Sequence, residues 1–265
     1  MSIHPTAVIK KGAELGMNVT VGPFAYIAAD TLIGDNSEIA PHAVIHRYTT
    51  LGSGCRVHAG AVLGDLPQDI AFGGEKSEVR VGDNCILREG VTIHRGTKPD
   101  TATVVGNDCF LMAFSHLAHN VVLGDGVIMA NGALLAGYVE VGARAFISGN
   151  AVVHQFTRIG RLAMISGLAG VGKDVPPFCT VQGVRRNEVG GLNVVGMRRA
   201  GMSPDERKQV KAAFAVLYRS GLNFSEAIER MKVEFRDGPA AEIWQFCEGS
   251  KRGVCPLTGS DDAGD

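Results

Sequence analysis

The sequence of 265 residues predicts an all-β parallel β-helix of hexapeptide repeats, followed by a small α-helical C-terminal domain. Three observations predict this fold. Aliphatic residues recur every sixth position, small residues recur two positions before them, and helix-start signals follow the point at which the period ends. A fixed short period with regular turn residues is typical of solenoid proteins, in which each repeat buries its apolar side against its neighbours.

The aliphatic period runs from Ile3 to Val171. Steps of six residues visit 29 positions in this range, and only Asp69, Glu75 and Pro99 are not aliphatic. Three hexads form one triangular coil, so residues 18 apart are expected to stack at about the 4.8 Å spacing of neighbouring strands. Glycine often follows the aliphatic position directly, as turn chemistry at a fixed offset requires.

The register of small residues includes Cys55, Cys85 and Cys109. The six cysteines of the chain show no spacing typical of metal ligands. We therefore interpret these three cysteines as small buried packing residues, and expect no metal and no cofactor.

Residues 64–80 and 94–104 lack the period and contain glycine, proline and charged residues. A solenoid does not need such segments for its stability. We expect them to form loops that project from the wall of the β-helix, and projecting loops often carry function. The alternative is a harmless insertion.

The period ends before the prolines of "KDVPPFCTVQG". We assign residues 1–185 to the β-helix, 186–202 to a connection and 203–265 to the helical domain. Ser203, Pro204 and Glu206 form a capping-box signature for a helix running to about Ser220. A second helix is predicted from Ser225 and a third over "AAEIWQFCE", and the final "TGSDDAGD" is expected to be disordered.

The formal net charge of −1 offers no general attraction to nucleic acid or to a membrane surface. The N-terminus lacks the apolar core of a signal peptide, and no apolar run has the length of a membrane span. We expect a cytoplasmic protein with no nucleic-acid partner.

Because one coil contains 18 residues, adding 18 to a residue number gives its expected neighbour on the next coil, and this identifies the stacks around "SHLAHNVVLG" (115–124). His119 lies under Gly137 and then Gln155, and Asn120 lies under Tyr138 and then Phe156. A histidine can take a proton from a hydroxyl or amine nucleophile, and a glycine N–H can hold an oxyanion. This pattern favours acyl transfer, with Gln155 as a substrate contact. A solvated histidine beside a turn glycine remains an equal alternative.

Several motifs together resemble one family. "PQD" (67–69), "TIHRGT" (92–97), "AHN" (118–120), "LAG" (135–137), "VHQF" (153–156) and "DVPP" (174–177) are similar to the acyl-carrier-protein-dependent UDP-N-acetylglucosamine O-acyltransferases of lipid A biosynthesis. The resemblance implies a left-handed β-helix and a homotrimer. It also implies transfer of a 3-hydroxyacyl chain from acyl carrier protein to the 3-position of the UDP-sugar.

The resemblance also implies roles for residues. His119 would be the general base and the Gly137 amide the oxyanion donor, while Gly167 would lie where the acyl tail is measured. The substrate-binding residues would be Gln68, Asp69, His94, His116, His154, Gln155, Asn193 and Arg199, the last two at the nucleotide. The basic run Arg198, Arg199, Arg207, Lys208 and Lys211 either docks the acidic carrier protein or is an ordinary solvated helix face.

Asn120, Tyr138 and Ala71 depart from the family pattern of Asp, His and Lys at these places. An amide at residue 120 can orient the imidazole but cannot offset its positive charge. The acceptor could therefore be the 3-amino sugar nucleotide, which needs less help from a base. A second alternative is a hexapeptide-repeat zinc carbonic anhydrase that uses His94, His116 and His119.

Overall fold

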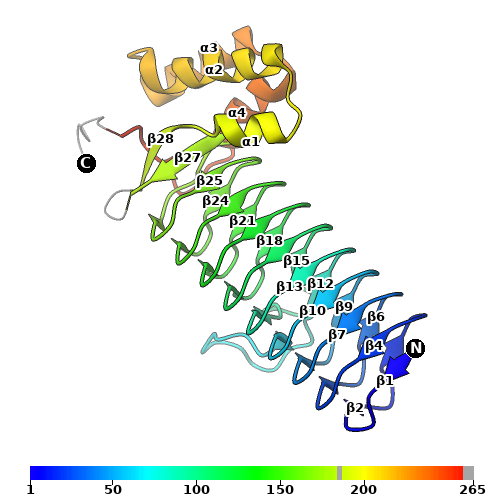
Figure 1. Cartoon of the computed structure of the whole chain (residues 1–265). Coiled ribbons are helices and arrows are strands. Elements are labelled where there is room, and N and C mark those ends of the chain that lie inside the picture. Colours follow the sequence, from blue (N-terminus) through cyan, green and yellow to red (C-terminus); the bar gives the residue numbers. More distant parts are fainter. Residues whose placement is uncertain (184–186, 259–265) are drawn as a thin grey trace.

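The computed structural model describes residues 1–183 and 187–258, and it shows a triangular β-helix with helices over one end (Figure 1). Three parallel sheets form its walls. Sheet A contains β1 (Ser2–Ile3), β4 (Thr20–Val21), β7 (Glu38–Ile39), β10 (Arg56–Val57), β13 (Ile86–Leu87), β16 (Phe110–Leu111), β19 (Ile128–Met129), β22 (Phe146–Ile147), β25 (Met164–Ile165), β27 (Cys179–Gln182) and β28 (Glu188–Leu192). Sheet B contains β2 (Val8–Ile9), β5 (Tyr26–Ile27), β8 (Val44–Ile45), β11 (Val62–Asp65), β14 (Thr92–His94), β17 (His116–Leu117), β20 (Leu134–Leu135), β23 (Val152–Val153) and β26 (Gly170–Val171). Sheet C contains β3 (Glu14–Leu15), β6 (Leu32–Ile33), β9 (Thr49–Leu51), β12 (Glu78–Val81), β15 (Ala102–Val105), β18 (Val122–Leu123), β21 (Glu140–Val141) and β24 (Arg158–Ile159).

The register of these sheets confirms the parallel β-helix predicted from the period. Ile3 pairs with Val21, 18 residues further on, and the same offset continues along each wall. The offset grows only where a coil carries a loop, as between Val57 and Leu87. The loops occupy residues 66–77 and 95–101, because β12 and β15 are longer than most strands and pair over four residues.

The core contains the aliphatic positions and the small-residue register. Leu63, Leu117 and Leu135 are fully buried. Cys55, Cys85 and Cys109 are at most 1% exposed, and all are free thiols. Their Sγ atoms point to backbone carbonyls of the next coil, such as Cys55 to Gly82 O at 3.1 Å. This confirms that these cysteines are packing residues.

The turns at the corners use left-handed backbone conformations. Asn120, Tyr138 and Phe156 have φ of 60°, 59° and 63° at equivalent positions of successive coils. Non-glycine residues adopt this conformation at a cost, asparagine at the least. The repeated geometry stacks their side chains outside one corner, where the Tyr138 and Phe156 rings lie 5.0 Å apart, nearly parallel.

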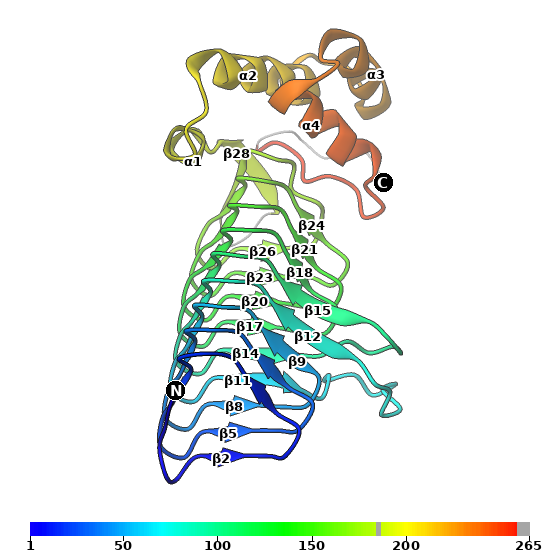
Figure 2. The same ribbon diagram turned by 90° about the vertical axis from the view of Figure 1, so that its right-hand side faces the viewer.

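The C-terminal end closes the β-helix with a β-hairpin and helices (Figure 2). Strand β27 pairs parallel to β25, and β28 returns antiparallel to β27. Within the described residues the helices are α1 (Val194–Arg199), α2 (Pro204–Arg219), α3 (Phe224–Glu234) and α4 (Gly238–Glu248). The stretch expected to be a plain connection, residues 186–202, thus contains all of β28 and all of α1.

The helix starts can be compared with the sequence signals. The capping box of Ser203 and Glu206 is present, with Pro204 in the first turn, which confirms the prediction for α2. The second helix begins one residue earlier than predicted, because Asn223 rather than a later residue caps it. The tail expected to be disordered lies almost wholly outside the described residues.

Two arginines attach α4 to the β-helix. Arg161 forms a bidentate pair with Glu242 at 2.8 and 2.9 Å, and the Arg158 guanidinium lies 4.2 Å above the Phe246 ring. Among the described residues, no helix combines the length and apolarity that crossing a membrane requires.

Candidate active site

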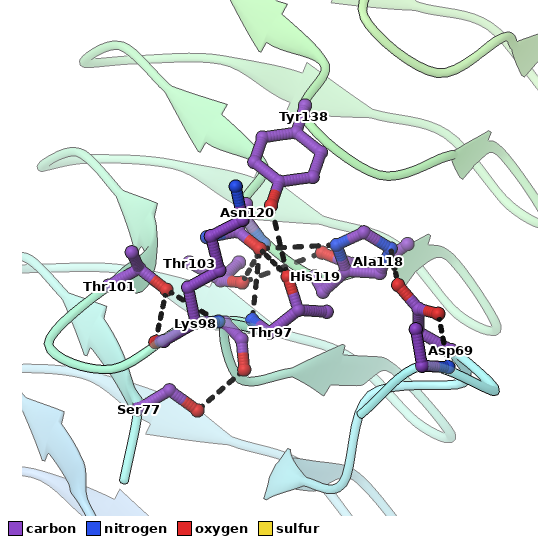
Figure 3. Close-up of polar contacts among 12 residues, drawn as sticks. Asp69, Ser77, Thr97, Lys98, Thr101, Thr103, Ala118, His119, Asn120 and Tyr138 are labelled. Atoms are coloured by element: carbon purple, nitrogen blue, oxygen red, sulfur yellow. Dashed lines mark hydrogen bonds and ion pairs between the residues drawn. The ribbon is translucent and has the colours of Figure 1, made fainter. Parts of the chain in front are cut away.

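His119 lies in the turn between β17 and β18, at the corner where sheet B meets sheet C. Both loops leave from the same corner, since 66–77 joins β11 to β12 and 95–101 joins β14 to β15. The corner therefore collects a histidine, two loops and the stacked side chains of successive coils, as Figure 3 shows.

The His119 imidazole lies flat against Gly137 of the next coil. A Cβ built on Gly137 would lie 2.5 Å from His119 Nε2 and 3.0 Å from Nδ1, so only glycine leaves room for the ring. Within the described chain, the Gly137 N–H donates no hydrogen bond, whereas its carbonyl accepts one from Phe156. The neighbourhood predicted from the stacking is thus confirmed, with a free amide beside the imidazole.

Asn120 fixes the tautomer of His119. His119 Nδ1 lies 3.1 Å from Asn120 Oδ1. The same oxygen accepts hydrogen bonds from the backbone N–H and the hydroxyl of Thr97, each at 3.0 Å. These donors hold the oxygen toward the ring, so Nδ1 carries the proton and Nε2 keeps a free lone pair.

Tyr138 completes this network from the coil above. Its ring meets the His119 ring edge-on, with centroids 5.3 Å apart and an angle of 82°. Its hydroxyl lies 3.0 Å from the Thr97 hydroxyl. Since Thr97 gives its own proton to Asn120, Tyr138 donates to Thr97. Thr97 thereby links Asn120 and Tyr138, two of the residues that depart from the family pattern.

Asp69 reaches the opposite side of the imidazole from the first loop. Its Oδ2 lies 3.9 Å from His119 Nε2, too far for a hydrogen bond, while Oδ1 accepts from the Ala71 N–H at 2.9 Å. The carboxylate and the basic nitrogen therefore face each other across a narrow gap. His119 is only 12% exposed and Asp69 32%.

His94 and His116 lie on the neighbouring strands β14 and β17, with ring centroids 4.8 Å apart and the rings edge-on. Burial lowers the pKa of His94, an effect that Asp65 partly opposes and His119 adds to. Burial, with a smaller contribution from His94, lowers the pKa of His116 to about 4. His116 Nδ1 also lies 2.7 Å from the Thr92 hydroxyl. Both histidines are therefore neutral at neutral pH and add no positive charge beside His119.

The remaining predicted residues differ in their placement. Gln68, His154 and Gln155 are exposed, and His154 Nδ1 donates to the Gln155 carbonyl at 3.1 Å. Gly167 lies at another corner, between β25 and β26. All four remain candidates, because no substrate contact tests them.

Asn193 and Arg199 are not brought to His119 within one chain. They line a cavity of about 590 Å³ at the corner between sheets C and A, beside Arg144 and Phe146. The Asn193 side chain caps α1 by accepting from Gly196 N, and it donates to the Leu162 carbonyl. A nucleotide contact by this amide would compete with both hydrogen bonds.

Sequence reasoning missed Thr97 and Arg95, although both stand in the quoted "TIHRGT". Their positions depend on loop contacts that no period predicts. Among the described residues, no group of three or more metal-ligating side chains was found.

A β-helix that holds a histidine, in a fixed tautomer, beside a free glycine amide defines an acyltransferase of the hexapeptide-repeat class. Hexapeptide-repeat transferase models match residues 12–47, 30–65 and 102–137. The model described as domain 2 of UDP N-acetylglucosamine O-acyltransferase matches residues 174–255. The chain belongs to the UDP-N-acetylglucosamine O-acyltransferase family.

Individual relatives support this assignment over nearly the whole chain. The acyl-[acyl-carrier-protein]–UDP-N-acetylglucosamine O-acyltransferase of Thermodesulfovibrio yellowstonii is 42% identical, over 96% of this chain and 98% of the relative. That of an Anaeromyxobacter species is 45% identical, over 96% and 99%. The UDP-N-acetylglucosamine acyltransferase structure from Francisella novicida has a TM-score of 0.93 at 35% identity, covering 97% of this chain and 95% of that one. That from Bacteroides fragilis has a TM-score of 0.91 at 38% identity, covering 95% and 98%.

Proposed function

We propose that the protein transfers a 3-hydroxyacyl chain from acyl carrier protein to the 3-position of UDP-N-acetylglucosamine. This would be the first step of lipid A biosynthesis, in the cytoplasm. The observation that carries the proposal is the free Nε2 of His119 beside the free N–H of Gly137. Family membership supports the substrate class, because the relatives are named for this donor and this acceptor.

In the proposed reaction, His119 Nε2 takes the proton of the acceptor hydroxyl as its oxygen attacks the thioester carbonyl. The Gly137 N–H holds the oxyanion that forms, which is commonly worth about 10²–10³ in rate. When the tetrahedral intermediate collapses, the C–S bond breaks and the imidazolium returns its proton to the leaving thiolate. No group beyond the two substrates is consumed.

The charge that develops on His119 needs a partner. Asn120 is neutral, so it can orient the ring without stabilising the imidazolium. The Asp69 carboxylate, 3.9 Å from Nε2, can supply the negative charge. Asp69 is therefore assigned to the base as well as to the sugar and acyl hydroxyls, for which the resemblance proposed it together with Gln68 and Gln155.

The neutral Asn120 also favours a second acceptor, the 3-amino analogue of the sugar nucleotide. An amine is a better nucleophile than a hydroxyl and requires less from its base. The Asp69 carboxylate at the edge of the gap can pair with the ammonium form of such an acceptor, which loses one proton to solvent before its nitrogen attacks the thioester carbonyl. His119 Nε2 then takes the second proton as the C–N bond forms. The chain could thus catalyse N-acylation at the same site.

A homotrimer would complete the nucleotide site. The outward side of sheet A carries an apolar ladder of paired residues: Ile86, Phe110, Ile128, Phe146 and Met164. On sheet B, the outward Leu134 and Val152 remain 39% and 47% exposed. Packing sheet A of one copy on sheet B of the next would cover both surfaces.

This packing sets which corners meet. When two β-helices of the same hand stand side by side with parallel axes, the chain runs in opposite directions along the two walls that face each other. The corner between sheets C and A of one copy therefore meets the corner between sheets B and C of the other. Asn193 and Arg199 would in this way approach His119 of the neighbouring copy, with Arg199 able to pair with a diphosphate.

The acyl chain would leave this corner along sheet B. Leu134, Val152 and Gly170 offer an apolar path from Gly137 toward Gly167, at the far end of the same wall. Gly167 has only the Gly149 carbonyl within contact of a built Cβ, at 3.4 Å. A side chain there would project into the path, so glycine suits a long acyl chain.

The carrier protein would dock on the helical domain. A groove between α1 and α2 is lined by Arg207, Lys208, Lys211 and Arg219, with no acidic residue, over the apolar Met197 and Phe214. A surface of one charge sign speeds encounter with an acidic partner. The groove thus supports docking over the alternative of an ordinary solvated helix face.

The test incubates the purified protein with 3-hydroxyacyl carrier proteins of several chain lengths and either acceptor, with products read by mass spectrometry. A mass gain of one hydroxyacyl group, lost in His119→Ala, supports the reaction and the base. Transfer to the amino sugar alone shifts the assignment to N-acylation. No product with either acceptor refutes the proposal.

A further inference from the structure

Arg95 is a buried cation with an unusual set of neighbours. It is 9% exposed, and its Nε is buried with no hydrogen-bond partner. Among the described residues, no carboxylate pairs with its guanidinium. Buried charges are normally paired, because the loss of hydration is otherwise uncompensated. The site must therefore favour this side chain in another way.

Two aromatic rings take the place of a carboxylate. The guanidinium carbon of Arg95 lies 5.5 Å from the centroid of Tyr48 and 5.4 Å from that of Phe72. A guanidinium is planar and weakly hydrated, so it stacks on aromatic faces more readily than a lysine ammonium. Tyr48 lies in the turn between β8 and β9 of the β-helix, whereas Phe72 belongs to the loop 66–77. Arg95 thus joins the loop to a corner turn of the β-helix.

The contact of Arg95 with Tyr48 and Phe72, called the clamp below, acts on the part of the loop that carries Asp69. The Phe72 N–H donates to the Asp69 carbonyl at 3.0 Å, and the Ala71 N–H donates to the Asp69 carboxylate. Asp69 and Phe72 are therefore the two ends of one hydrogen-bonded turn. The Arg95 N–H also donates to the Asp65 carbonyl at 3.1 Å, where the loop begins. A single residue thereby fixes both the start of the loop and its turn.

We propose that Arg95 is a positioning residue, which through Phe72 holds the Asp69 carboxylate opposite Nε2 of His119. The proposal rests on the proposed function, in which Asp69 stabilises the imidazolium. It assigns a task to the arginine of "TIHRGT", which makes no contact with His119 in the structure. Loss of the clamp would let Asp69 move away while the imidazole and the Gly137 amide stay in place.

The main test is a double-mutant cycle of Arg95→Met and Asp69→Asn, measured as kcat/KM and as its separate constants. Each single variant is expected to lower kcat about tenfold, as the loss of two cation–π contacts in Arg95→Met or of one partly exposed ion pair in Asp69→Asn allows. The double variant should lose no more than the worse single one, because Arg95 acts through Asp69. Losses that multiply, or full activity of Arg95→Met, would overturn the proposal.

Matched variants separate positioning from general damage. Arg47→Met removes another cation from the same Tyr48 ring, 5.1 Å away, but Arg47 pairs with Asp30 and does not touch the loop. It should keep full activity. Arg95→Lys should retain more kcat than Arg95→Met, and Phe72→Leu should resemble Arg95→Met. A loss in Arg47→Met equal to that in Arg95→Met would contradict the clamp.

Hydrogen exchange supplies a readout that does not depend on turnover. The amides of Ala71 and Phe72 should exchange at least tenfold faster in Arg95→Met, whereas those of the neighbouring strands should not change. Unchanged exchange in the loop would refute the clamp even in an active enzyme. Faster exchange in a protein that transfers no acyl chain would sustain the clamp and reject the proposed function instead.

Discussion

The substitution Gly137→Ala tests the contact on which the proposed chemistry depends. The new Cβ would lie 2.5 Å from His119 Nε2. An ordinary contact needs about 3.4 Å or more, so the imidazole must move by roughly 1 Å. Gly137 does not have a left-handed backbone, so the main chain can accept alanine without strain. The ring can swing toward the solvent, since it is 12% exposed.

The expected loss follows from this displacement. A misplacement of about 1 Å can cost on the order of 10²-fold in rate. Stability should change little, by about 1 kcal/mol, because the crowded ring is not sealed in the core. Steady-state kinetics with both substrates, beside a thermal melt, should therefore show a fall in kcat of about 100-fold and a Tm only a few degrees lower.

Two controls make the result decisive. Gly172→Ala adds the same atom where it would meet only Asn187, at 3.6 Å, and it should stay active. In a His119→Ala background, Gly137→Ala should cause no further loss, because the displaced ring is absent. Wild-type kcat in Gly137→Ala, or an equal loss in the background lacking His119, would refute the idea that the glycine serves to seat the imidazole.

Three further predictions follow from the network. Asn120→Asp should raise kcat with the hydroxyl acceptor by up to about tenfold, since a carboxylate stabilises the imidazolium; an unchanged rate would show that Asp69 already suffices. Thr97→Val should lower kcat about fivefold with little change in KM, because one of the donors that orient Asn120 is lost; Tyr138→Phe, which keeps the Thr97–Asn120 bond, should lower it less. Because the pKa of His116 is lowered to about 4 in the folded protein, the unfolded chain binds a proton first as the pH falls below about 6.5. Thermal melts should therefore show stability decreasing between about pH 6.5 and 4, and a curve of equal slope in His116→Gln would contradict this.

The fold was largely predictable because each coil repeats one local rule. An aliphatic residue every sixth position, with small residues at a fixed offset, leaves one way to bury them all, and the stacking of His119 on Gly137 follows from counting. The capping box at Ser203 could likewise be identified from the sequence, because it depends on residues within one helical turn.

The loop contacts could not be predicted in this way. Asp69 meets His119 only because Arg95 and two rings hold a loop without any period. Helix α1 was missed because it is short and preceded by two glycines. Asn193 stays a predicted nucleotide contact, and its capping of this helix was a further contact that the sequence analysis did not predict. Long-range contacts of irregular segments are set by packing, which spacing does not encode.

The two ends of the β-helix differ in how well their last coils are covered, and this difference determines where unfolding begins. At the C-terminal end, β28 and the helices cover the last coil. At the N-terminal end, the first coil stacks on one neighbour only, and Ile3 and Val8 remain 43% and 46% exposed. In a stack stabilised by nearest neighbours, the end with fewer contacts unravels first. Thermal fraying should therefore advance coil by coil from residue 1 and reach the corner of His119 only after several coils have been lost.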